Sequence, residues 1–388
     1  MPRAHAPLLS ILAAAFLGFS CAPAGRDPSQ AESSSRAGYP PANAADSAFA
    51  ATVAELSEEG GYFDTDNLVS NETSYLLAVS DIRAHGTHGG AYIGVGPDQS
   101  FSYIAATKPE VAYLIDIRRD NLAQHLLFRA LFTEARNRAE YLLLLTGREL
   151  GDDVEAWSGR PLDELIAKVN SSFGLSDQER QQTRDRLLAR AASFGVPLSP
   201  QDRAAMMQLL QSFATEGLEL RFTTFGREPS PDYPTFRQLI SGHDREGEPA
   251  SYMATEEAFQ TVKRMEQEGR VIPVVGDLAG PHALAAIGRD AAARGLTVSL
   301  LYVSNVEYYL MRDGTFGRFA ATAASLPRDS TSLVIRSCFR RACGPAGPDA
   351  GSPSAQLVQP LDSMAAMTGR GGYRSYADLI RGSLPTAR

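Results

Sequence analysis

One short stretch of the chain constrains its fold more than any other. Residues 91–93 are predicted to form a strand that runs into the turn Gly94-Val95-Gly96-Pro97, and residues 101–107 have the pattern of a short helix. The apolar run at residues 111–117 (VAYLIDI) then indicates a buried strand with Asp116 near its end. A strand, a glycine turn, a helix and a second strand in about 30 residues are typical of a βαβ unit, which builds parallel sheets.

The rest of the chain alternates in the same way. Strands followed or preceded by helices predict an α/β fold with a doubly wound, mainly parallel sheet that helices cover on both faces. The body of this fold is expected over residues 49–388. Helices are expected at residues 70–83, 121–145, 256–267, 282–294 and 306–311, and strands at residues 271–275, 297–303 and 332–335.

Between these alternating parts lies a stretch that is helical in pattern throughout. We interpret residues 151–216 as a helical insertion, in which Ser176 and Glu179 have the spacing of a capping box at a helix start. Residues 218–224 are expected to form a strand. Residues 344–359 are rich in Pro and Gly and are expected to form a loop.

The N-terminus has the zones of a secretory signal. Arg3 and His5 precede the apolar run at residues 8–19, and Ser20-Cys21 follows it. The run is too short to span a bilayer. It resembles a bacterial lipoprotein signal over residues 1–21, which implies that Cys21 becomes the lipidated first residue of the mature chain; the alternative is plain cleavage, with Cys21 incidental.

This signal predicts a protein that is exported and lipid-anchored to a bacterial membrane, on its periplasmic or surface face. Residues 22–48 are rich in Ala, Pro, Ser and Gly without an apolar period, and are expected to be a flexible tether. No later apolar stretch approaches the length that a membrane-spanning helix needs.

Charge and cysteine content narrow the partners and the compartment. The 388 residues include 37 Lys and Arg against 45 Asp and Glu, a net charge of −8, so nucleic acid is not an expected partner. Cys338 and Cys343 are close enough in sequence for a small-loop disulfide, which would agree with export. The alternative is two free thiols near a strand end.

Three strand ends are candidates for a binding site, because doubly wound sheets bind ligands beyond the carboxyl ends of their strands. At Gly94 and Gly96 the missing side chains let a ligand approach the backbone. Asp116 stands where a carboxylate can accept hydrogen bonds from a ribose, and Gly276-Asp277 ends a third strand. The alternative is that these glycines serve only tight turns.

At these residues the chain resembles class I S-adenosylmethionine-dependent methyltransferases. The resemblance implies that Gly94, Gly96 and Pro97 bind the cofactor, that Asp116 holds its ribose and that Asp277 has a catalytic role. The match departs from the family pattern, since Tyr92 replaces an acid, Asp98 replaces the third glycine and the Asn/Asp-Pro-Pro-aromatic motif is absent.

Longer segments are similar to an uncharacterised family of bacterial proteins, often lipoproteins, with a methyltransferase-like core. The segments are residues 70–75 (SNETSY), 89–121, 271–284 and 300–310. Two functions of different class follow. The first is a methyltransferase-like protein that binds S-adenosylmethionine or a related small nucleoside. The second is an exported, non-enzymatic lipoprotein that uses a degenerate core to bind a ligand or a partner.

The predicted compartment bears on this choice. S-adenosylmethionine is made and kept in the cytoplasm, so an exported enzyme would lack its methyl donor. A degenerate core that binds another ligand agrees with both the signal and the resemblance.

Other polar groups have two interpretations each. His85 and His88 could bind a metal ion together with Glu72. The favoured interpretation is a glycine-rich loop before a strand, so no metal site is assigned. Arg118 and Arg119, with Lys108, could hold an anion near Asp116 or be solvated charges.

The segment after the strand at residues 297–303 is also ambiguous. Ser304 or Asn305 could cap the following helix, while Glu307 and Tyr308 could face the cleft.

Overall fold

The computed structural model describes residues 43–151, 153–225, 227, 230–339, 342–343 and 352–385. Within these residues seven strands form one sheet, in the order β3-β2-β1-β4-β5-β6-β7. The strands are β1 (Ala91–Gly94), β2 (Val111–Asp116), β3 (Val271–Val275), β4 (Val298–Tyr302), β5 (Leu333–Phe339), β6 (Ser354–Pro360) and β7 (Leu384–Pro385).

The first five strands are parallel to one another, and β6 and β7 extend the sheet with antiparallel pairs. The expected α/β fold with a mainly parallel sheet is therefore confirmed, and the antiparallel extension makes the sheet mixed. From β1 the chain proceeds outward through β2 to β3, and then returns to β4 on the other side of β1. The direction of winding thus switches between β1 and β4.

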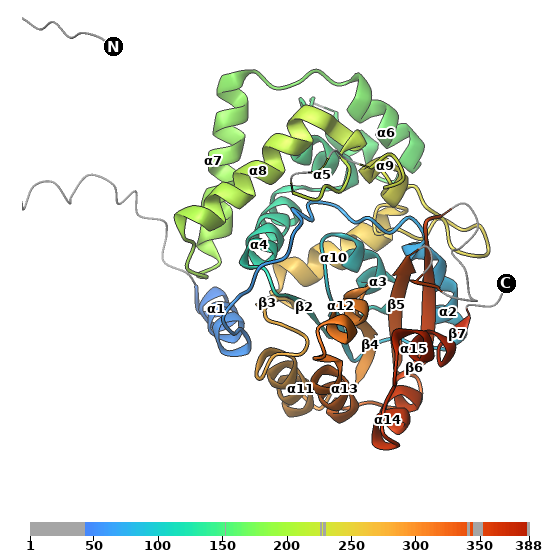
Figure 1. The fold of residues 1–388 in the computed structure, drawn as a ribbon. Coiled ribbons are helices and arrows are strands. Elements are labelled where there is room, and N and C mark those ends of the chain that lie inside the picture. The colour runs from blue at the N-terminus through green and yellow to red at the C-terminus, as the bar shows by residue number, and fades with distance from the viewer. Residues whose placement is uncertain are drawn as a thin grey trace, which may run out of the picture. The chain divides into compact units, whose positions relative to one another are not determined.

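The parallel strands form because their side chains are apolar on both faces. Every residue of β3 and of β4 is buried, as expected for strands between two layers of helices. In Figure 1, α3 (Gln99–Thr107), α4 (Arg119–Glu134) and α10 (Glu256–Gln267) lie on one side of these strands, and α11 (Ala283–Ala293) and α13 (Phe316–Ser325) lie on the other.

The stretch after β2 is helical, as the pattern indicates. Ser176 and Glu179 form the expected capping box, and a second box begins at Ser199. The helices α7 and α8 pack against α4, outside the layer of the sheet. The elements are α5 (Arg138–Leu145), η3 (Val154–Trp157), α6 (Leu162–Ser171), α7 (Asp177–Ser193), α8 (Pro200–Glu216), η4 (Gly217–Glu219) and α9 (Phe236–Ile240).

The remaining helices come before the first strand or after β4 in the sequence. At the start are α1 (Ala44–Leu56), η2 (Tyr75–Leu77) and α2 (Ala78–Ala84), and toward the end are α12 (Val306–Arg312), α14 (Leu361–Gly369) and α15 (Tyr376–Arg381). Within the described ranges, no helix combines the length and the apolar character needed to cross a bilayer.

Several predicted boundaries are wrong, each for a local reason. The helix expected at residues 121–145 is two helices, because Ala135 is extended and the Asn137 side chain caps α5. The strand expected at residues 218–224 does not form. The segment begins with η4, and Arg221 and Thr224 then each make one isolated bridge, to different segments.

Three further predictions fail. Helix α1 begins at Ala44, inside the expected tether, because Asn43 caps it and Phe49 and Val53 are buried. The loop expected at residues 344–359 contains most of β6, whose backbone pairs with β5. The helix expected at residues 70–83 starts only with η2, since residues 70–72 have no regular structure and residues 73–74 form a turn.

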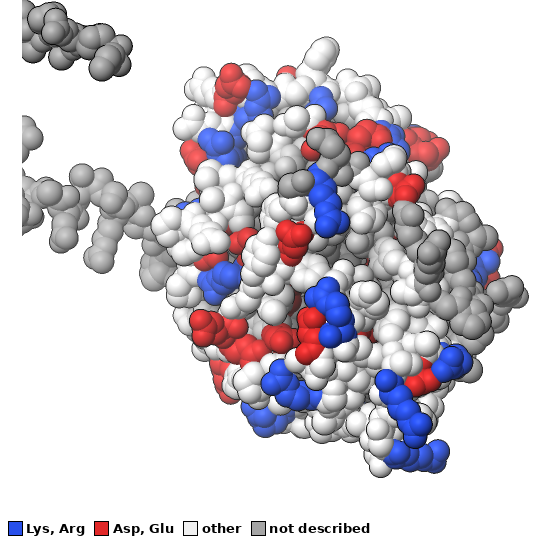
Figure 2. Space-filling model, in the orientation of Figure 1, with Lys and Arg blue, Asp and Glu red and all other residues white. Residues whose placement is uncertain are grey.

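Charges of both signs lie on the face of the protein that Figure 2 shows. Lys and Arg side chains alternate there with Asp and Glu side chains, and no continuous basic surface is seen on that face. The absence of nucleic acid as a partner stays a prediction.

Candidate functional site

The carboxyl ends of the parallel strands form one edge of the sheet, and one segment crosses it. Residues 57–74, which we call the strap, join α1 to η2 and run across this edge (Figure 1). The strap begins at β3, where Glu58 N donates to Val275 O (2.9 Å), and passes β2, where Gly61 N donates to Ile117 O (2.7 Å). It reaches the ends of β4, β5 and β6 through Glu72.

The turn that follows β1 lies at the carboxyl edge of the sheet and is buried. Residues 94–98 are all buried, and the carbonyl of Gly96 bonds to Nε2 of His125 on α4 (2.9 Å). Gly96 has φ +85°, which favours glycine. A Cβ on Gly94 would lie 2.2 Å from the hydroxyl of Tyr92, so that glycine makes room for the chain's own side chain.

Asp116 ends β2 as predicted, and both of its carboxylate oxygens are occupied. Arg118 donates to Oδ1 through its backbone amide (2.9 Å) and to Oδ2 through Nη2 (3.1 Å). The same guanidinium donates through Nη1 to the strap carbonyls of Thr65 (3.2 Å) and Asp66 (3.0 Å). The two side chains are 12% and 7% exposed, so this ion pair is nearly dry and binds the strap to β2.

Asp277 lies at the neighbouring strand end, since Gly276 N donates to Asp116 O (2.8 Å). Its carboxylate accepts from Ala279 N (2.9 Å) and so closes its own turn. The amides around it are taken by Glu58 of the strap, which accepts from Asp277 N (3.0 Å), His282 N (2.9 Å) and Ala283 N (3.1 Å). Glu58 thus provides the anion that the amino end of α11 attracts.

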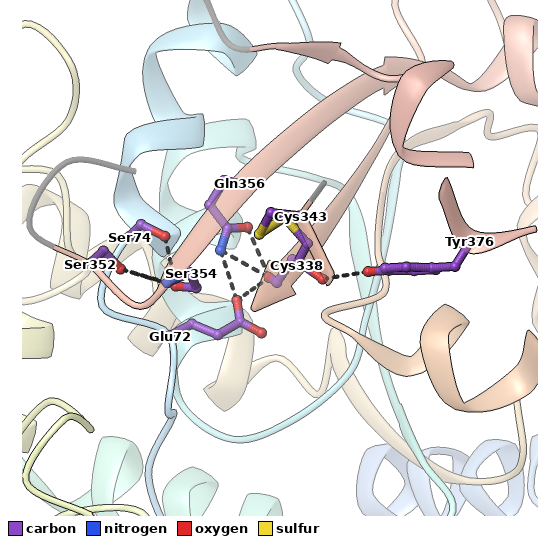
Figure 3. The surroundings of a disulfide bond; sticks show 9 residues. Glu72, Ser74, Cys338, Cys343, Ser352, Ser354, Gln356 and Tyr376 are labelled. Carbon is purple, nitrogen blue, oxygen red and sulfur yellow. Dashed lines mark hydrogen bonds between the residues drawn. A yellow bond between two sulfur atoms is a disulfide. The ribbon is translucent and has the colours of Figure 1, made fainter. Parts of the chain in front are cut away.

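A second strap carboxylate, Glu72, is buried where the winding switches direction between β1 and β4. Oε2 accepts from Tyr302 OH (2.7 Å) and Gln356 Nε2 (3.0 Å), and the hydroxyls of Ser304 and Ser337 also donate to Glu72. Figure 3 shows Glu72 facing Gln356 beside the Cys338–Cys343 disulfide. We call Glu72, Tyr302, Ser304, Ser337 and Gln356 the switch-point cluster.

Ser304 has the most strained backbone of this cluster. Its φ is +51° at the turn between β4 and α12, a conformation that costs a non-glycine residue about 1 kcal/mol or more. Its hydroxyl donates to Glu72, and its carbonyl accepts from Ser337 N (2.7 Å). Strain held in this way by surrounding contacts is common at functional sites.

Around the turn after β1 lie polar atoms that are buried without a partner among the described residues. They are Oε1 of Gln99, Oδ1 of Asp98 and Nδ1 of His125. Gln99 Nε2 donates to Tyr302 OH (3.4 Å), which connects this group to Glu72. Burial raises the pKa of Asp98 to about 7 and lowers the pKa of His125 to about 4.

The metal interpretation fails, because its ligands lie at opposite edges of the sheet. His85 and Thr87 bond to the carbonyls of Ser330 and Thr331, before β5, whereas Glu72 lies at the carboxyl ends. Within the described ranges, no group of three or more His, Cys, Asp or Glu residues could hold a metal ion.

The basic residues near Asp116 do not converge. Arg118 pairs with Asp116, Arg119 with Asp202 on α8 and Lys108 with Glu257 on α10. Glu307 does not face the edge either, since it is fully buried against Arg336. Tyr308 is 43% exposed.

The structure describes two of the three cysteines. Cys338 and Cys343 form a disulfide at the end of β5. Cys21, with the signal at residues 1–21, lies outside the described residues.

Sequence reasoning missed most of the switch-point cluster. It named Glu72 for another role and Ser304 as a cap, and it overlooked Tyr302, Ser337 and Gln356. A polar residue inside an apolar strand is the only local signal for Ser337, and Gln356 stands in the stretch that the sequence assigned to a loop.

We predict that Asp116→Ala lowers the free energy of unfolding by about 3 kcal/mol, because it leaves the buried Arg118 without its carboxylate. Denaturant unfolding measures this loss. The matched control is Asp313→Ala, whose pair with Arg312 is exposed and should contribute at most about 0.5 kcal/mol. Equal losses in the two variants would contradict the structural role of Asp116.

We also predict that the stability of Asp98→Asn relative to the wild type rises with pH. The folded carboxyl keeps its proton up to a pKa of about 7, whereas the unfolded one ionises near pH 4, so the wild type loses stability as pH rises through this range. The difference should grow by at most about 1.4 kcal/mol per pH unit and level off above pH 7. Denaturant unfolding at several pH values measures it.

His125 and Glu266 also change stability with pH, since burial lowers the pKa of the first and raises that of the second to about 8. Both are present in the two proteins, so their contributions cancel in the comparison. Asp163→Asn, on the exposed start of α6, is the control. A constant difference between Asp98→Asn and wild type from pH 4 to 8 would show that Asp98 is ionised when folded.

Comparison with known proteins gives one family. A family model described as "Domain of unknown function (DUF7790)" matches residues 67–195 and 203–383. No curated protein matches the chain. The matched ranges hold the whole sheet apart from the last two strand residues, together with Glu72 and the switch-point cluster, while Glu58 precedes them. The chain therefore belongs to the DUF7790 family.

Proposed function

We propose that this protein is an exported, lipid-anchored binding protein with a methyltransferase-like core that it does not use for S-adenosylmethionine. The strand order β3-β2-β1-β4-β5 is that of doubly wound nucleotide-binding folds, which supports the likeness of the core. A shared fold leaves the function open, so the function is inferred from the residues at the strand ends.

The main support for this proposal is that the strap occupies the groups that would bind a cofactor. In a doubly wound sheet a nucleoside cofactor would lie against the strand ends, with its ribose on Asp116 and its polar groups near the turn after β3. Here Arg118 saturates Asp116 and the strap lies on Arg118, while Glu58 takes the three amides around Asp277 and α11. A cofactor would have to displace all of these contacts.

The predicted compartment supports the same conclusion. If Cys21 is lipidated, the folded body lies outside the cytoplasm, where the methyl donor is made. Loss of the cofactor site would then cost the protein nothing, and the strap would be free to become part of the fold.

A second candidate function is binding of S-adenosylmethionine or a related nucleoside after the strap opens. The unpartnered buried atoms of Asp98 and Gln99 favour it, because buried polar atoms are nearly always hydrogen-bonded. In that case Gly94, Gly96 and Pro97 would hold the cofactor, and Asp277 would stand near the methyl acceptor.

We predict that S-adenosylmethionine and S-adenosylhomocysteine leave the Tm of the wild-type protein unchanged. A ligand that binds only the folded state adds about 2.7 kcal/mol at 100 times its Kd, so binding would be visible as a higher Tm. Thermal unfolding with each compound, supported by calorimetric titration, makes the test.

The variant Glu58→Ala separates the two candidate functions, because it frees the amides at α11 and weakens the strap. Its matched control is Glu59→Ala, an exposed neighbour. Absence of binding in all three proteins supports the proposal. Binding by wild type overturns it, and binding by Glu58→Ala alone overturns it in favour of a cofactor site that the strap closes.

We also predict that mass spectrometry of the mature protein finds an acylated Cys21 at its N-terminus. Globomycin, which blocks cleavage of lipoprotein signals, should then cause a larger, uncleaved form to accumulate. Cys21→Ala should abolish acylation. A mature chain that keeps Met1, or one cleaved elsewhere without acylation, would refute the lipid anchor.

A further inference from the structure

A pocket of about 650 Å³ lies between α12, α13, α14 and the turn that leads into α15. Its volume is in the range of small-molecule sites. None of the residues that line it holds the strap, so its ligand does not depend on whether the strap opens.

The walls of the pocket are aromatic and fixed in place. Tyr308 and Tyr376 form an edge-to-face pair (5.4 Å between ring centroids), and Phe316 forms another with Tyr373 (6.1 Å). Tyr376 OH donates to Ser337 O (3.2 Å), and Gln359 Nε2 donates to Tyr373 OH (2.9 Å). Rings held by these bonds keep their positions before a ligand arrives, which reduces the entropy cost of binding.

Four glycines also line the pocket. Gly314, Gly317, Gly371 and Gly372 line the pocket, and a Cβ built on any of them would meet no atom within 4 Å. Gly317 lies in the first turn of α13, where most other residues have a higher helix propensity than glycine. Side chains at these positions would narrow the pocket.

The charge that faces the pocket is positive. Arg312 and Arg374 line it, and no Asp or Glu is among its described lining residues. Arg312 pairs with Asp313 outside the pocket, whereas Arg374 has no ion pair among the described residues. An arginine without a carboxylate partner can pair with an anionic ligand and stack on a flat ring.

We propose that this pocket binds a small aromatic molecule that carries an anionic group such as a carboxylate or a sulfonate. The four rings provide stacked and edge-to-face contacts for the aromatic part, which aromatic pairs prefer. Arg374 binds the anionic group at the rim. An aliphatic ligand would lose the ring contacts, and a cation would be repelled by both arginines.

The probe for this proposal is 8-anilinonaphthalene-1-sulfonate, a fluorescent aromatic anion. Fluorescence titration of the full protein is expected to show saturable binding at one site. Gly317→Leu should weaken this binding at least about tenfold by filling the pocket, and no atom lies within 4 Å of a Cβ at this position. Gly369→Leu is the matched control, because Gly369 ends α14 outside the pocket and also has open space around it.

The charge requirement is tested separately with N-phenyl-1-naphthylamine, a neutral probe of similar shape. Arg374→Gln should weaken binding of the anion about tenfold, as expected for a lost charge-assisted hydrogen bond, and leave the neutral probe unchanged. Arg370→Gln, just outside the pocket, is the control for net charge.

Thermal unfolding confirms that each variant is folded. If Gly317→Leu and Gly369→Leu bind the anion equally well, the proposed site is wrong. If Arg374→Gln and Arg370→Gln weaken it equally, the pocket does not recognise the anionic group. Absence of saturable binding by the wild type also overturns the proposal.

Discussion

The buried carboxylate of Glu72 is the interaction on which the other parts of this structure depend. Taking a carboxylate out of water costs roughly several kcal/mol, and only hydrogen bonds or a counter-charge offset that cost. Four donors meet Glu72, and they come from β4, the turn after it, β5 and β6. Each of these segments must therefore keep its register for the others to be satisfied. The strap is fixed to the sheet at this end by Glu72 and at the other by Glu58, so both of its ends depend on carboxylates that accept several hydrogen bonds.

These carboxylates explain why the strap can cover the carboxyl ends of the parallel strands, where a doubly wound sheet usually binds its ligand. The groups that attract ligands in such folds are free amides at helix starts and acids at strand ends. Here Glu58 accepts the amides at α11, and Arg118 neutralises Asp116 and holds the carbonyls of Thr65 and Asp66. The groups that the resemblance to methyltransferases assigns to a cofactor are thus used within the protein itself. Glycine turns and strand-end acids are consequently ambiguous, because the same groups can serve a ligand or a covering segment.

The sequence predicted those parts of the fold that local patterns determine. The limits of β3 and α10 agree with the predicted ones, since an apolar run and an amphipathic period have clear ends. Strand β6 was missed because its side chains Ser354, Gln356 and Gln359 are polar yet buried, and only their partners on other segments explain their burial. The partners of Glu72 are 230 to 284 residues away along the chain, so no spacing rule connects them. The strap was missed for the same reason, as nothing in residues 57–69 indicates which strand ends they cover.

The antiparallel extension has a polar interior, and this interior connects the strap to the aromatic pocket. Arg336 is completely buried in β5, where it pairs with Glu307 of α12 (Nη2 to Oε1, 3.2 Å) and donates to Gln359 of β6 (3.0 Å). That pair holds α12, and with it Tyr308, against the sheet. The next residue, Ser337, donates its hydroxyl to Glu72, while its carbonyl accepts from Tyr376 in the pocket wall. One residue of β5 thus contacts both the anchor of the strap and the aromatic pocket. A shift of β5 along its length would therefore disturb the contacts of Glu72 and of Tyr376 together.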